Sequence, residues 1–364
     1  MLVKDITTII EAFAPLAYQE SYDNSGLIVG NENDEVTGIL ISLDCVEEIL
    51  DEAIAKNCNM IIAHHPIVFS GLKKFNGANY IERTVIKAIK NNIALYAVHT
   101  NLDHVKNGVN FKIAEKIGLK NCSVLQPKKN LLTKIVTYSP KDAAGAVRAA
   151  MFDAGAGSVG DYSECSFNID GVGTFKGGEN THPVVGEVGK LHHENESRIE
   201  TIVPFHLVNK VVANLMAAHP YEEVAYDVFE LQNTHGNVGS GLIGELENEE
   251  DELSFLKRLK IDLNTACVRH TKLLNNKVKR VAVCGGSGSF LLDNAIASKA
   301  DVFITGDFKY HQFFDSENKI IIADVGHYES EQYTSELIYE ILNEKFPNFA
   351  VSLTENNTDP VNYL

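Results

Sequence analysis

Short apolar runs and amphipathic helical patterns alternate along the first third of the chain. Residues 36–42 and 60–63 are apolar runs typical of buried strands, and residues 46–56 between them have apolar positions at helical spacing. Strand, helix and strand in this order predict parallel strands joined by a right-handed crossover. A second helix–strand pair ends at residue 98, so residues 1–127 are predicted to form one α/β lobe.

The pattern changes near Pro127. Predicted elements then follow in the order β-α-β-β-α-β, which is the order of a ferredoxin-like α+β domain, so residues 128–233 are predicted to be an inserted module. Its adjacent pair His192-His193 falls in a polar stretch and is interpreted as a loop with two surface histidines. Strand–helix alternation resumes and predicts a second, similar lobe over 234–364. The fold class is therefore α/β, with two α/β/α lobes forming one core.

Histidines follow the ends of two predicted strands in the first lobe. His64 and His65 come directly after the strand 60–63, and a second strand ends in the run from His99 to Asp103 and His104. The C-terminal ends of parallel strands meet at one edge of a sheet, where α/β proteins place ligand sites. His99, Asp103 and His104 compete for a ligand role there. Asp103 is favoured because a carboxylate can bridge two cations and neutralise their charge.

A third strand, 320–323, is followed by His327 and Glu331, four residues apart at the opening of a helix predicted over 328–345. This spacing puts both side chains on one helical face, whereas Glu329 points elsewhere. All the candidate ligands are expected along one rim of a central sheet. The predicted metal ligands are His64, His65, Asp103, His327 and Glu331.

These ligands offer nitrogen and oxygen without thiolate, which suits zinc first, with manganese or iron(II) as alternatives. Five side chains cannot close two coordination shells, so two divalent ions per chain would keep open positions for water, as in a catalytic site. Asp307 and His311, just beyond the strand 302–305, are candidate catalytic residues as proton carriers or as groups that orient the ligands. Surface or capping roles remain open for both.

Three further segments have two interpretations each. Asp23 and Asn24 are turn formers or polar groups that face the site. Asp44 caps the following helix or lies near the metals. The turn 285–289, Gly-Gly-Ser-Gly-Ser, follows a strand and precedes a helix, so it is a phosphate-binding turn or a tight packing turn.

Composition excludes some classes of protein. The chain has 364 residues and a net charge of −17, which opposes nucleic acid as the main partner. Neither a signal-peptide layout nor an apolar run of membrane-spanning length is present. The six cysteines include no Cys-x-x-Cys pair, which is typical of reduced thiols. A cytoplasmic protein is therefore expected.

Several motifs together resemble one family. The runs 23–30 (Asp-Asn-Ser-Gly-Leu-Ile-Val-Gly), His64-His65-Pro66, 99–103, 305–311 and 326–331 are similar, in order, to those of the GTP cyclohydrolase 1 type 2 homologues. The resemblance covers residues 1–126 and 234–364, and Tyr22 stands where many members have tryptophan. The middle segment resembles the PII-like insertion of the longer bacterial members.

The resemblance implies a dinuclear metal centre on the five residues named above and a toroidal homohexamer with the metal sites facing an inner cavity. The family label implies opening of the GTP imidazole ring with loss of formate, but no guanine-reading motif is evident. The first functional hypothesis is a metal-dependent hydrolase of a nucleotide or phosphorylated small molecule. The second is a non-catalytic, metal-dependent regulatory or sensor module whose insertion binds a ligand.

Overall fold

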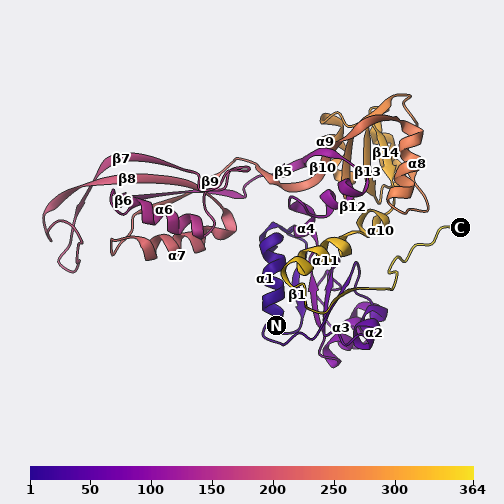
Figure 1. Cartoon of the computed structure of the whole chain (residues 1–364), viewed down its shortest axis with the longest axis horizontal. Coiled ribbons are helices and arrows are strands. Elements are labelled where there is room, and N and C mark those ends of the chain that lie inside the picture. Colours follow the sequence, from indigo (N-terminus) through magenta and orange to yellow (C-terminus); the bar gives the residue numbers. More distant parts are fainter. The chain divides into compact units, whose positions relative to one another are not determined.

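The computed structural model describes all 364 residues, which form two compact units (Figure 1). The first unit combines Met1–Gln126 with Asn237–Leu364, and the second is Pro127–Gly236. The two α/β lobes thus pack into one body, and the second unit is an insertion between them. No helix in the structure has the length and apolar character needed to cross a membrane.

A five-stranded sheet in the order β1-β4-β3-β2-β15 forms the first lobe. Its central strands are parallel, and their apolar residues are buried because helices cover the sheet. The strands are β1 (Gly26–Val29), β2 (Ile39–Ser42), β3 (Met60–Ala63), β4 (Ala94–Ala97) and β15 (Val351–Leu353). The helices of this region are α1 (Val3–Phe13), α2 (Glu47–Ala55), α3 (Tyr80–Lys90), α4 (Thr100–His104) and α5 (Val109–Lys116).

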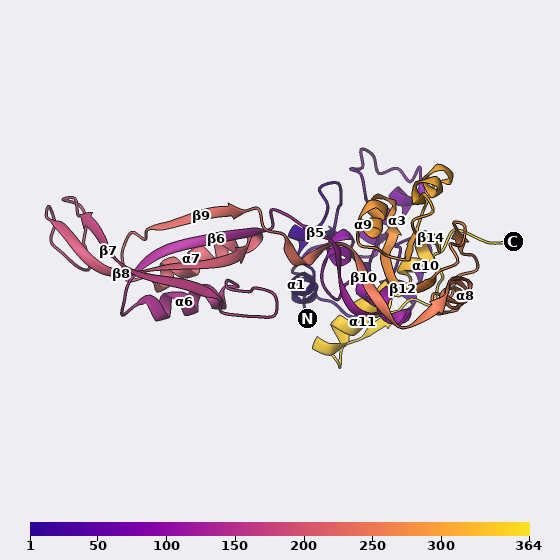
Figure 2. The ribbon, with the colours of Figure 1, turned by 90° about the horizontal axis from the view of Figure 1, so that it is seen from above.

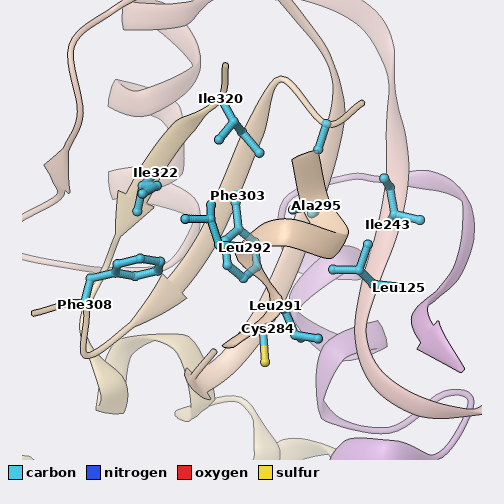
Figure 3. Close-up of a cluster of buried hydrophobic side chains, with 12 residues drawn as sticks. Leu125, Ile243, Cys284, Leu291, Leu292, Ala295, Phe303, Phe308, Ile320 and Ile322 are labelled. Atoms are coloured by element: carbon cyan, nitrogen blue, oxygen red, sulfur yellow. The ribbon is translucent and has the colours of Figure 1, made fainter. Parts of the chain in front are cut away.

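A six-stranded sheet in the order β11-β14-β13-β12-β10-β5 forms the second lobe. The strands β12 (Lys277–Ser287), β13 (Val302–Gly306) and β14 (Ile321–Asp324) are parallel neighbours. The remaining elements are β5 (Lys120–Lys128), β10 (His235–Asp251), β11 (Arg269–His270), α8 (Glu252–Asp262), α9 (Leu292–Ala297), α10 (His327–Glu331) and α11 (Thr334–Lys345). Phe303, Phe308 and Ile322 pack with residues of α9 in a buried cluster, which holds this helix against the sheet (Figure 3).

The end of the chain returns to the first lobe. The helix predicted over 328–345 is two helices, α10 and α11, and α11 packs beside α1, from the opposite end of the chain (Figure 1). The short strand β15 then pairs in parallel with β2. The expectation that all of residues 234–364 form a separate lobe is therefore wrong for the segment from α11 onward, which packs on the first lobe. A three-residue strand has no pattern of its own in the sequence, and its position depends on pairing with a distant strand.

The inserted unit has the predicted β-α-β-β-α-β order and an antiparallel sheet in the order β7-β8-β6-β9. Its elements are β6 (Leu132–Pro140), α6 (Ala144–Asp153), β7 (Ser166–Lys176), β8 (Leu191–Pro204), α7 (Val208–Ala218) and β9 (Tyr226–Leu231). Both helices cover one face of the sheet and share one apolar core with it (Figure 1, Figure 2). The ferredoxin-like prediction is confirmed. The predicted loop at His192-His193 is wrong, since both residues lie in β8, where His193 is exposed and His192 is half-buried beside Phe175.

Candidate metal centre

Four histidines and two carboxylates from the two lobes meet at the C-terminal ends of their strands. His64 and His65 follow β3, His99 follows β4, and Asp103 lies in α4. His327 and Glu331 begin and end α10, which follows β14. The expectation of one common rim is wrong, because the first four residues come from the five-stranded sheet and the last two from the six-stranded sheet. Three groups have donor atoms within 4.8 Å of one another: His64, His65 and His99; His65, His327 and Glu331; His64, Asp103 and Glu331.

Each of the four imidazoles is held through Nδ1 by an oxygen atom. The pairs are His64 with Val98 O at 2.8 Å, His65 with Asp44 Oδ1 at 2.8 Å, His99 with Asp23 Oδ1 at 2.6 Å and His327 with Asp307 Oδ2 at 2.7 Å. In a neutral imidazole, an oxygen acceptor at Nδ1 takes the one N–H and leaves the lone pair on Nε2, which is the usual arrangement of histidine ligands. All four imidazoles are therefore held in an orientation in which Nε2 could bind a metal ion.

Glu331 lies at the middle of the cluster and is only 4% exposed. Its Oε2 is 3.0 Å from His65 Nε2 and 3.1 Å from His327 Nε2, and its Oε1 is 3.8 Å from His64 Nε2. The carboxylate thus touches histidines from both lobes. Its position makes it the natural shared ligand of the cluster.

Two buried polar atoms show that the cluster suits a cation. His64 Nε2 and Asp103 Oδ1 are buried and have no hydrogen-bond partner. They are 3.6 Å apart, which is too long for a hydrogen bond. A buried polar atom without a partner costs about 1–3 kcal/mol, so proteins rarely keep one without reason. An imidazole nitrogen and a carboxylate oxygen are ordinary ligands of a divalent cation, and such an ion would satisfy both.

The electrostatics of the cluster show how strongly it attracts positive charge. Burial alone would lower the pKa of His65, but the carboxylates of Asp44 and Glu331 outweigh it and raise the pKa to about 10. In the same way, Asp307 and Glu331 outweigh burial and raise the pKa of His327 to about 11. Burial, together with the negative charge of Glu331, raises the pKa of Asp103 to about 7. Without metal ions, the side chains of His65, His327 and Asp103 therefore bind protons more readily than usual.

Metal binding is therefore expected to release protons. At pH 7.5 the His65 and His327 imidazoles of chelator-treated protein are protonated, because their pKa values of about 10 and about 11 lie above that pH. A ligand must give up this proton, so the apparent zinc affinity should rise with pH between 6 and 8. Calorimetric titration in buffers of different ionisation enthalpy should show at least about one proton released per chain. An affinity independent of pH, without proton release, would contradict this electrostatic description.

The glycine-rich turn that follows Cys284 makes room for Glu331. Gly286 has φ +59°, and a Cβ there would lie inside van der Waals contact of Glu331 Oε1. The N–H groups of the three glycines are already used: Gly285 donates to Asn110 Oδ1, Gly286 to Ser330 Oγ and Gly288 to Thr305 Oγ1. The phosphate-binding interpretation is therefore not supported, and the turn is a tight packing turn beside the cluster.

Some of the other candidate residues contact the cluster and some do not. Asp23, Asp44 and Asp307 each hold a histidine of the cluster by a hydrogen bond. Asp23 also accepts from Asn24 N, so it belongs to the turn as well as to the site. Asp44 does not cap helix α2. His104 is buried away from the cluster, with Nδ1 2.9 Å from Tyr18 O and Nε2 3.2 Å from Ser240 Oγ. His311 is exposed, packs beside Tyr310 and Phe314, and does not line the cavity at the cluster. These contacts do not support a catalytic role for His311.

A cavity of about 720 Å³ opens beside the cluster. His65, His99 and His327 line it, together with Phe69 and Arg269. The C-terminal residues Asp359, Pro360, Val361 and Tyr363 also line the cavity, and Thr358 Oγ1 donates to Asp44 Oδ2 at 2.8 Å. No sequence signal indicated this role of the C-terminus. The cavity is large enough for a small-molecule ligand.

Fold and site together define an α/β protein of two lobes with a histidine–carboxylate cluster that could hold metal ions, and with a ferredoxin-like insertion. Comparison with known families is more specific: the model of Duf34/NIF3 (NGG1p interacting factor 3) matches residues 1–360. The chain belongs to this family.

Relatives match over the full length of the chain. The GTP cyclohydrolase 1 type 2 homolog of Bacillus subtilis (strain 168) is 36% identical over 366 residues, which cover 99% of this chain and 98% of the relative. The crystal structure of a Bacillus cereus protein related to NIF3 is 38% identical, with a TM-score of 0.87, and covers 100% of this chain and 99% of that one. The structure of Staphylococcus aureus protein SA1388 is 32% identical, with a TM-score of 0.80 and the same coverage. The sequence resemblance to the GTP cyclohydrolase 1 type 2 homologues is thus confirmed.

Proposed function

We propose that this protein is a metal-dependent hydrolase of a nucleotide or another phosphorylated small molecule. The observation that carries the proposal is the cluster of nitrogen and oxygen donors that opens to a cavity of about 720 Å³. A structural metal site is closed by protein ligands, whereas a catalytic site keeps a position open to substrate. The cavity gives a substrate access to His65, His99 and His327.

The proposed cofactor is a pair of divalent ions, zinc first and manganese or iron as alternatives. Their proposed ligands are His64, His65, Asp103, His327 and Glu331, and His99 is a further candidate because its Nε2 is left free in the same way. When bound, such ions supply Lewis-acid polarisation of the substrate and activation of water. Asp44 and Asp307 hold the imidazoles in one orientation, so Asp307 is proposed as a positioning residue.

The aromatic residues around the cavity suit a planar substrate. Five carboxylates line the cavity as well, so the positive charge that holds an anionic substrate has to come mainly from the proposed metal ions; the carboxylates are Asp44, Asp307, Asp324, Glu329 and Asp359. Phe69 lies 6.2 Å, between ring centroids, from both His99 and Tyr22, so an aromatic surface leads from the cluster toward solvent. Arg269 is the one arginine or lysine of the lining; its side chain pairs with Asp324 and is 54% exposed. We propose that the aromatic rings contact a base and that Arg269 and the metal ions attract phosphate. The name of the Bacillus subtilis relative makes GTP the first substrate to test.

The test is a screen of GTP and other phosphorylated metabolites with wild-type protein and an Asp103→Asn variant. The wild type should turn over at least one of them, lose this activity in EDTA and recover it with zinc or manganese. Asp103→Asn should lose most of the bound metal and reduce kcat/KM by at least about a hundredfold, because it removes a buried anionic ligand. Asp293→Asn, which makes the same change at an exposed residue of α9 outside the cluster, is the control and should keep both the metal and the activity.

Two results would contradict the proposal. Full metal content and activity in Asp103→Asn would remove this residue from the ligand set. Tight binding of a metabolite without any turnover, over the whole screen, would instead favour a non-catalytic regulatory module.

We also propose a homohexamer in the cytoplasm. The hexamer is what the sequence resemblance to the GTP cyclohydrolase 1 type 2 homologues implies, and the six free cysteines agree with a reducing compartment. Light scattering coupled to size exclusion should give a mass about six times the 40.1 kDa of the chain. A monomer mass at micromolar concentration would contradict the assembly without affecting the metal centre.

A further inference from the structure

We propose that the inserted unit contains a second binding site, and that its ligand is a small organic cation that carries an ammonium or guanidinium group. The site is a cavity of about 450 Å³, which lies wholly within Pro127–Gly236. Its walls are the end of β7, the segment that follows β7, Glu196 of β8 and residues of the turn before β9. The volume is within the range of small-molecule sites. This inference does not depend on the hydrolase proposal.

The segment His219-Pro-Tyr-Glu-Glu223 builds one wall of this cavity. His219 is buried, its Nε2 lies 2.9 Å from Tyr138 O, and its Nδ1 accepts from Tyr221 N at 3.1 Å. Both ring nitrogens are therefore used, and the neutral tautomer with hydrogen on Nε2 satisfies both contacts. His219 is thus an anchor rather than a ligand-binding group. It fixes Tyr221, Glu222 and Glu223 at the cavity.

Aromatic rings supply surfaces that attract a cation. Phe175, Tyr221 and Tyr138 all line the cavity. The rings of Phe175 and Tyr221 are 6.3 Å apart and inclined by 56°, so they form two differently directed walls. The face of an aromatic ring carries partial negative charge and binds ammonium and guanidinium groups.

The charges of the lining select the sign of the ligand. Three carboxylates, of Glu196, Glu222 and Glu223, line the cavity, against the single and exposed Lys176. Tyr221 Oη donates to Glu196 Oε1 at 3.0 Å, which fixes this carboxylate but leaves it acceptor capacity for a ligand. Such a lining repels phosphate and attracts a cation.

Two further contacts hold the walls of the cavity in place. Glu196 lies directly over the backbone of Gly173, where a Cβ would come within 2.7 Å of the carboxylate carbon. Glu222 Oε1 accepts from His182 N at 2.9 Å, which fastens the segment after β7 across the cavity. Pro183, Val184 and Val185 of that segment add an apolar wall. Combined aromatic, apolar and carboxylate walls fit an organic cation better than a hydrated metal ion.

Isothermal titration of the full-length chain tests the inference with two cationic probes, agmatine and benzyltrimethylammonium, and with inorganic phosphate as the anionic comparison. At least one cationic probe should bind with a saturable, one-per-chain isotherm, and phosphate should not bind at this unit. Glu196→Gln and Phe175→Ala should each weaken binding about tenfold, through loss of a charge and of an aromatic face. Glu230→Gln, an exposed carboxylate of β9 outside the cavity, is the matched control and should change nothing.

The proposal is overturned if neither cationic probe binds at millimolar concentration, or if Glu230→Gln weakens binding as much as Glu196→Gln. If Glu196→Gln lowers the melting temperature, Glu223→Gln replaces it, since Glu223 is exposed and its loss removes a charge without disturbing Tyr221. Gly173→Ala should reproduce the loss, because the new Cβ displaces the Glu196 carboxylate. Unchanged binding in both Glu223→Gln and Gly173→Ala also overturns the proposal.

Discussion

Replacement of Glu331 by glutamine is expected to abolish metal binding at the centre, with a loss of affinity of at least about a hundredfold and a matching loss of any hydrolytic activity. The carboxylate contacts His64, His65 and His327 and is almost fully buried. Glutamine keeps the shape but removes the negative charge that holds cations among three imidazoles. Metal analysis after dialysis, together with a zinc competition titration, measures the effect.

Glu329→Gln is the matched control, because this residue lies on the same short helix and is also buried but belongs to none of the three candidate ligand groups. It should keep the wild-type metal content. The melting temperature of both variants separates ligand loss from unfolding. Equal metal content in Glu331→Gln and wild type would exclude Glu331 from the ligand set.

Gly286→Ala is expected to damage the same centre without changing a proposed ligand. The residue has φ +59°, which costs an alanine about 1–2 kcal/mol, and its Cβ would collide with the Glu331 carboxylate. Because Glu331 is enclosed by histidines, it has no free space to move into. We therefore expect both a lower melting temperature and a metal affinity reduced by about tenfold or more.

Gly118→Ala separates the two causes. Gly118 has a similar backbone, with φ +77°, but nothing lies within 4 Å of the Cβ position. It should lower the melting temperature through backbone strain alone and leave metal binding unchanged. Gly286→Ala with wild-type metal affinity would show that the turn does not position Glu331.

The local pattern was sufficient to predict most of the fold. Buried runs such as 60–63 and the helical spacing between them predicted the parallel strands, and β-α-β-β-α-β order predicted the inserted unit. The return of α11 and β15 to the first lobe could not be predicted. It depends on packing against α1 and on pairing with β2, about 300 residues away, and a three-residue strand has no pattern of its own.

The residues of the candidate site that could be predicted are those whose type and spacing favour metal binding over other roles. His64-His65 after a buried strand, and His327 with Glu331 at helical spacing, led to residues that the structure brings together. The orienting carboxylates were harder to predict, since an aspartate after a strand, such as Asp44, serves equally well as a helix cap. His99 competed with Asp103 in sequence, whereas the structure places both at the cluster. The role of Thr358 required the folded C-terminus.

Anomalous diffraction at the zinc edge from crystals of zinc-loaded protein tests the central claim most directly. The account predicts two peaks per chain among the donor atoms of His64, His65, Asp103, His327 and Glu331, both lost in Glu331→Gln crystals. Zinc peaks found only elsewhere, or none at this cluster in fully loaded protein, would contradict it.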